Sequence, residues 1–201
     1  MPRAGLLGFR AGNFGASNAT WKAMAAAGLT LSSNFDLCYL SKTCKILWPR
    51  RETALFDTGL GVWELPISNF VEAGGGYRHV QIMAVSFAEA RDYLYEARRL
   101  GIPEVTLVTH SFEYFWLDSI PGRRGRPNRI NRDRLRGLCA FLRDHAGEFE
   151  VDTVGALARR LPPPPAERRN GEPVVPRGKP LYRYRRLLEQ AYKRVESRLP
   201  I

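Results

Sequence analysis

The stretch Val105-Thr106-Leu107-Val108-Thr109-His110-Ser111-Phe112-Glu113 decides the fold of this chain. Its apolar, β-branched first half follows a turn at Gly101-Ile102-Pro103, which predicts a buried strand. In parallel-sheet folds, the side chains at the carboxyl ends of strands face the ligand pocket. His110 has this position, and histidine exchanges protons near neutral pH, so we expect either a catalytic residue or a satisfied core histidine. Glu113 either orients the His110 ring or is exposed.

Strand and helix signals alternate around this stretch. Residues 6–9 predict a short strand that enters a glycine-rich loop, and Ser17 or Asn18 caps a helix over 18–27 that Gly28 ends. A strand over 29–34 completes a β-α-β unit. Ser86 caps a helix over 87–100, which leads into the His110 strand. Further strands are predicted at 60–67 and 77–85, and further helices at 131–146 and 154–161. Together these signals predict an α/β fold.

Composition limits the class of protein. The 201 residues are 44% hydrophobic and 25% charged, with a net charge of +11. Three cysteines (Cys38, Cys44 and Cys139) form no CxxC pair, so we expect no disulfide framework and no zinc finger. The chain has no apolar run long enough for a membrane span and no signal-peptide core, so as written it is expected in the cytoplasm.

The basic residues concentrate in two regions. The arginine-rich segment 123–136 lacks interleaved aromatic residues, so a solvated or anion-binding loop is favoured over a nucleic-acid site. Four prolines, Pro162–Pro165, mark a boundary that divides the chain into a domain at 1–161, a linker at 162–180 and a basic amphipathic helix at 181–201. This helix is predicted to be a charge-rich surface helix, with docking on a membrane, an acidic partner or nucleic acid as the alternative.

Two further charged residues are candidates for a site. Arg10 lies in the loop after the first strand, where an arginine can pair with a carboxylate or orient a substrate, or can simply be exposed. Glu64 lies in an apolar run before Pro66, where a buried carboxylate needs a partner. For Glu64 we favour an outward-facing position on the strand. His79 is predicted to be structural.

Several segments resemble, in order and spacing, the polysaccharide deacetylase family. The resemblance covers about residues 5–160 and rests on Gly8-Phe9-Arg10-Ala11-Gly12-Asn13-Phe14-Gly15, Ser32-Ser33-Asn34, Trp63-Glu64-Leu65-Pro66 and Leu107–Glu113. It implies a distorted (β/α) barrel and metal-dependent hydrolysis of N-acetyl groups on a polysaccharide, with zinc as a typical metal. By this resemblance Arg10 braces the catalytic base, His110 protonates the departing amine and Leu107 lines the acetate pocket. Trp63 is a candidate to stack on a sugar ring.

The sequence departs from that family in one respect. It has no Asp-Asp pair and no H-x-x-x-H pair, which supply the family's general base and metal ligands. We therefore expect an N-terminally truncated domain, the C-terminal part of a distorted (β/α) barrel with a basic helical tail. The expectation is that this chain holds no cofactor and releases no acetate alone.

Three functional hypotheses follow. The first is a deacetylase-like domain whose partner is an acetylated polysaccharide or oligosaccharide. The second is a non-catalytic module that binds a glycan or a protein, and the third is a basic protein that binds an acidic polymer. A part-barrel exposes strand edges, so a protein partner or self-association at that edge is also expected.

Overall fold

The computed structural model describes residues 5–116, 125–162 and 172–197. Much of the proline run and part of the arginine-rich segment, residues 163–171 and 117–124, lie outside the described residues. The helices are α1 (Asn18–Ala26), α2 (Phe87–Arg99), α3 (Arg129–Asp144), α4 (Val154–Arg160) and α5 (Pro180–Glu196). The strands are β1 (Gly8–Phe9), β2 (Leu31–Ser32), β3 (Phe56–Asp57), β4 (Trp63–Glu64), β5 (Asn69–Val71), β6 (Tyr77–His79), β7 (Phe115–Trp116) and β8 (Arg126–Pro127).

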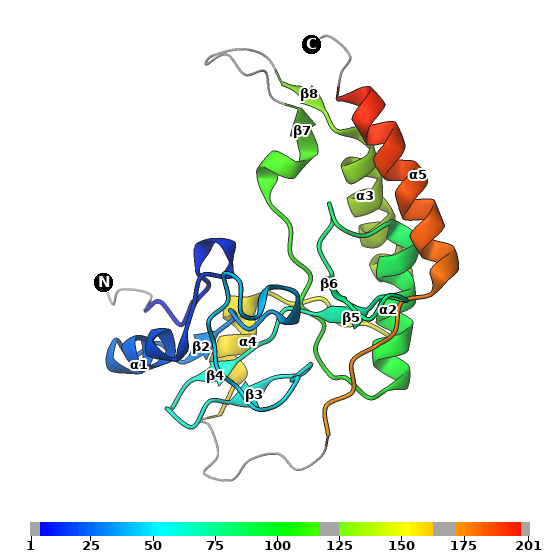
Figure 1. The fold of residues 1–201 in the computed structure, drawn as a ribbon. Helices are drawn as coiled ribbons and strands as arrows, with labels where there is room; N and C mark the ends of the chain where they lie inside the picture. The colour runs from blue at the N-terminus through cyan, green and yellow to red at the C-terminus, as the bar shows by residue number, and fades with distance from the viewer. Residues whose placement is uncertain (1–4, 117–124, 163–171, 198–201) are drawn as a thin grey trace.

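The strand-helix-strand unit predicted for the start of the chain is confirmed. A capping box between Ser17 and Thr20 begins α1, and β1 pairs in parallel with β2 on either side of it. Gly8 permits this pairing, because a Cβ atom there would lie 2.7 Å from the carbonyl oxygen of Leu31. The sheet has the order β1-β2-β4-β3, with β3 antiparallel to β4 (Figure 1). The fold is therefore mixed α/β, and the described strands do not close into a barrel.

The regular strand predicted over 105–109 does not form. Val108 makes one isolated parallel bridge to Gln81, with Val108 N–H donating to Val80 O at 3.1 Å and Ile82 N–H to Val108 O at 3.2 Å. The strand predicted at 77–85 shortens to β6, which pairs with β5. Two turns accompany these differences. Gln81 N–H donates to His79 O at the end of β6, and Ala84 N–H donates to Gln81 O and bends the chain away after a single bridge.

Opposite faces of the four-stranded sheet contact different helices. Leu31 and Leu65 pack against Ala158 of α4, whereas the alternating residues Ser32 and Glu64 hydrogen-bond Trp21 of α1 on the other face. The α1 side continues into a cluster of buried residues: Ala16, Trp21, Phe35, Leu37, Cys44, Ile46 and Phe56. Because both faces are covered, the outward-facing position predicted for Glu64 is wrong.

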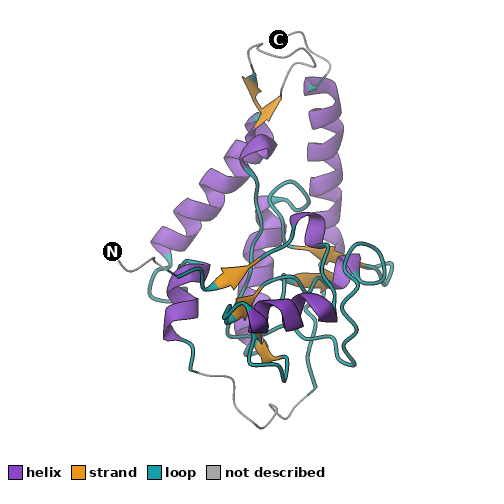
Figure 2. Ribbon diagram, turned by 90° about the vertical axis from the view of Figure 1, so that its left-hand side faces the viewer, coloured by secondary structure: helices purple, strands orange, loops and turns teal. Residues whose placement is uncertain are grey.

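The longer helices form a second layer beside the sheet. Ser86 caps α2 as predicted, and the structure adds Glu89 as its capping-box partner; α2 packs against both α3 and α5. The cap of α3 is Asn128, three residues before the predicted start of that helix at residue 131. The β7–β8 hairpin lies at the far end of these helices from the sheet (Figures 1 and 2). Among the described helices none has the length and apolar composition to cross a membrane.

Candidate functional site

The strongest candidate site is a histidine–carboxylate pair at the end of the deciding stretch. A single 3-10 turn at Ser111–Tyr114 follows His110 and brings Glu113 back beside it. His110 Nδ1 lies 2.9 Å from Glu113 Oε1. The Glu113 side chain is 1% exposed, whereas that of His110 is 46% exposed. A buried carboxylate thus orients a ring that solvent can reach, so of the two alternatives for Glu113 the structure shows the orienting one.

Neighbouring side chains hold this pair in place. The Gln81 amide donates to Glu113 Oε1 and lies 3.4 Å from His110 Nδ1. Asn131 donates to the backbone oxygen of Glu113 at 2.7 Å. Phe112 stacks on the His110 ring, with 5.0 Å between centroids. Because Nδ1 is engaged and no hydrogen bond among the described residues involves Nε2, Nε2 is the nitrogen that can exchange a proton with a bound molecule.

Arg10 lies at the carboxyl end of β1 and is bound to the neighbouring strand. Its Nε donates to Ser33 O at 3.0 Å and its Nη2 to Ser33 Oγ at 2.6 Å. Burial lowers the pKa of the Arg10 guanidinium, and the nearby carboxylates of Glu64 and Asp36 oppose that shift. None of the described contacts of Arg10 reaches His110, so the structure shows no direct link between these two predicted site residues.

Glu64 is fully buried and accepts four hydrogen bonds. Trp21 Nε1 donates at 2.7 Å and the Ser32 hydroxyl donates to the same oxygen, while the backbone N–H groups of Asn34 and Phe35 donate to the other at 2.6 and 2.9 Å. Burial raises the pKa of the Glu64 carboxyl, and these donors counteract the increase. Glu64 therefore joins α1, β2 and the loop after β2, and it does not point toward solvent.

The two remaining predicted site residues lie in apolar surroundings. Leu107 packs against the cluster around Phe70, Val80 and Tyr93, and it lines a cavity of about 570 Å³ beside α2 and α3. Trp63 packs beside Leu31 and Leu65, and its Nε1 donates to Pro162 O at 2.8 Å. No described contact connects either residue with His110.

A second histidine–carboxylate pair lies in the core. His79 Nδ1 is 3.1 Å from Asp36 Oδ2, and Asp36 also accepts from Cys38 N–H at 2.9 Å and Asn69 Nδ2 at 3.0 Å. His79 is 6% exposed and Asp36 is not exposed at all. This pair joins the turn after β2 to the β5–β6 hairpin, where a structural role accounts for it.

The described residues contain no ligand set for the metal that the family resemblance implies. Over residues 5–116, 125–162 and 172–197, no three His, Cys, Asp or Glu side chains come together in a way that could hold a metal ion. The residues present therefore do not fit that group, and the chemistry of this site is derived from His110 and its neighbours alone.

Comparison with known proteins identifies no relative of this chain. No protein family, no curated protein and no solved structure matches the chain.

Proposed function

We propose that this chain is a polysaccharide deacetylase-like domain that binds an N-acetylated glycan and carries the proton donor of that site. The observation that carries the proposal is the 2.9 Å contact between His110 Nδ1 and the buried Glu113 carboxylate. A carboxylate in this position selects one tautomer and fixes the orientation of the ring. His110 Nε2–H can then donate to the amine nitrogen as its bond to the acetyl carbon breaks and water supplies the hydroxyl group of acetic acid. The other proton of that water passes to solvent, and His110 takes up a proton from solvent in return.

The arrangement of the strands supports the same proposal. Polar residues lie at or after the ends of neighbouring extended segments. Arg10 follows β1 and Asn34 follows β2, while Gln81 lies in the next segment and His110 follows Val108. Ligand sites of parallel sheets and barrels form at this edge. We therefore propose that these segments belong to a distorted (β/α) barrel.

Binding and turnover are separate expectations for this chain. Proton donation alone accelerates a reaction by about 10²–10⁴-fold, far less than enzymes typically achieve. Since no group of side chains that could hold a metal ion occurs among the described residues, we propose binding without measurable acetate release by the chain alone.

The test uses the three histidines of the chain, which are resolvable by NMR after selective histidine labelling. Chitotetraose, which is fully N-acetylated, is titrated into the protein, with its deacetylated counterpart as the matched ligand. We expect the ring signals of His110 to shift with the acetylated ligand alone, while those of His79 and His145 stay in place.

Three results count against the proposal. Unchanged His110 signals at millimolar chitotetraose refute the glycan site, as do equal shifts with both ligands. Zinc-dependent acetate release from this chain refutes the expectation of binding without turnover.

A further inference from the structure

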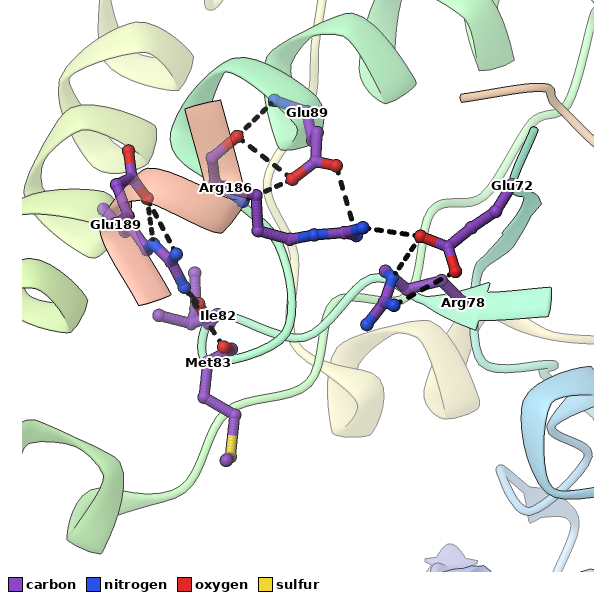
Figure 3. Close-up of polar contacts among 9 residues, drawn as sticks. Glu72, Arg78, Ile82, Met83, Glu89, Arg186 and Glu189 are labelled. Carbon is purple, nitrogen blue, oxygen red and sulfur yellow. Dashed lines mark hydrogen bonds and ion pairs between the residues drawn. The ribbon is translucent and has the colours of Figure 1, made fainter. Parts of the chain in front are cut away.

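Helix α5 docks on the rest of the chain through its charged face. Arg186, whose side chain is 2% exposed, lies 2.6 Å from Glu72 Oε1 and 3.2 Å from Glu89 Oε1, and Glu72 also binds Arg78 (Figure 3). One turn along, Glu189 Oε2 accepts from Nε of the buried Arg134 at 2.9 Å and lies 2.7 Å from its Nη2. These ion pairs show that charged side chains of the tail helix lie against the protein.

The position of Arg134 strengthens this contact. Its Nη1 also donates to the backbone oxygens of Ile82 and Met83 at 2.9 and 3.1 Å. Further along α5, Lys193 Nζ donates to Asn131 Oδ1 at 2.9 Å. The charged face of α5 is thus matched to its site on the domain, and it is not a solvated face as the sequence predicts.

The apolar face of α5 is consequently exposed. Leu181 and Leu188 are each 73% exposed, Tyr184 is 67%, Val195 is 63% and Tyr192 is 54% exposed. Their spacing of three or four residues places them on one side of the helix. Single exposed apolar residues are ordinary, but a continuous row of this kind marks an interaction surface.

The row has the spacing of a helix-pairing seam. Leu181, Leu188 and Val195 are seven residues apart, with Tyr184 and Ala191 between them, which gives the a-d-a-d-a pattern of a heptad repeat. Arg185 and Arg194 then occupy an e and a g position beside the seam, and both are exposed. Residues at e and g choose the partner by charge, so this seam selects acidic residues opposite.

We propose that the exposed face of α5 binds an acidic amphipathic helix of a protein partner. The apolar rows of the two helices would interlock, and Arg185 and Arg194 would pair with glutamate or aspartate on the other helix. A second copy of this chain presents the same arginines, so like charges would meet across the seam. This proposal is independent of the site at His110.

The probe is a three-heptad peptide with leucine at a and d and glutamate at e and g. A matched peptide carries lysine at e and g. Titration calorimetry with the full chain is expected to show the acidic peptide binding at least about tenfold more tightly than the basic one, with weaker binding at high salt. The double variant Arg185→Glu/Arg194→Glu is expected to reverse this preference while keeping every apolar residue.

Leu188→Glu should weaken acidic-peptide binding by about tenfold or more, because it places a charge in the apolar seam. Leu60→Glu is the control, since Leu60 is a partly exposed leucine outside α5. Equal affinity for the two peptides, or binding that Leu188→Glu leaves unchanged, overturns the proposal. Two other results also overturn the proposal, provided that neither peptide binds and that Leu188→Glu abolishes the effect. One is a dimer that forms with rising protein concentration, and the other is flotation of the protein with phosphatidylcholine–phosphatidylserine vesicles.

Discussion

Replacement of Arg186 by methionine tests whether ion pairs hold α5 in place. Methionine keeps the apolar stem of the side chain but leaves Glu89, which is 6% exposed, without its cation. Removing one partner of a buried ion pair costs about 3–5 kcal/mol. Glu72 still contacts Arg78, and Glu89 still accepts from Ser86 N–H at 2.8 Å, so we expect a loss near the lower limit, about 3 kcal/mol.

Urea denaturation followed by circular dichroism measures this loss. With a slope of about 2 kcal/mol per molar urea, the midpoint should fall by about 1.5 M. Arg185→Met is the matched control, because the Arg185 side chain is 62% exposed and its pairing with Glu189 is weak. A second substitution, Glu89→Gln, should recover part of the loss by removing the unpaired charge.

The pH dependence of the Arg186→Met variant follows from Glu89. Burial already raises the pKa of the Glu89 carboxyl in the native chain, and Arg186 counteracts this increase. Without Arg186 the folded-state pKa rises further above the unfolded value. The deficit should therefore shrink as the pH falls from 7 toward the unfolded pKa of glutamate, because the folded variant then takes up a proton. A loss below about 1 kcal/mol at pH 7, or one that Glu89→Gln does not reduce, refutes this account of α5 docking.

Three further predictions concern the core, a close contact and acid stability. Glu64→Gln should lower the unfolding free energy by about 2–4 kcal/mol in urea denaturation, because Trp21 Nε1–H and the Ser32 hydroxyl lose a charged acceptor; an unchanged midpoint contradicts this. Gly178→Ala should cost about 1–3 kcal/mol, since its Cβ would lie 2.7 Å from the buried Phe70 ring. Gly155→Ala in α4 should be neutral or stabilising, as thermal melts can show, because its Cβ would meet only the end of the Arg159 side chain at 3.9 Å. Arg78, and to a smaller extent Arg186, lowers the pKa of Glu72 to about 2. The stability that this carboxylate contributes is therefore present above about pH 4.5 and is lost as the pH falls from there to about 2. Glu72→Gln should flatten that part of the stability–pH curve.

Local signals predicted the helices and the first parallel strand pair. Ser17 and Ser86 begin α1 and α2 with capping boxes, whose partners lie three residues away and can be read from the sequence. The strand expected at 105–109 failed for a non-local reason. Its length depends on how far the neighbouring segment stays extended, and the turn after Gln81 limits the contact to one bridge.

The candidate site was predicted in part. His110 and Glu113 are three residues apart, so their pairing was among the alternatives that the sequence offered. Gln81 and Asn131 were missed, although Gln81 is a polar residue in a predicted strand neighbouring that of His110, which is a usable signal. A buried Glu64 was one of the alternatives, but its donor could not be foreseen, because Trp21 lies 43 residues away.

The orientation of α5 could also not be predicted from the sequence. Its amphipathic pattern shows two faces but does not state which one contacts the domain. The decision rests on Glu72, which is 114 residues from Arg186 in the chain. An inward charged face is unusual, since burial of charge is favourable only where the partners are already in place.

The ion-pair contact of α5 and the sheet core contribute differently to the heat capacity of unfolding. Exposure of apolar surface raises the heat capacity of unfolding, and exposure of polar surface lowers it. Release of α5 uncovers Glu72, Glu89 and Arg134, whereas unfolding of the sheet uncovers aromatic residues such as Trp21 and Phe35. Cooling weakens apolar packing, so at low temperature the attachment of α5 keeps its strength better than the core beneath the sheet does.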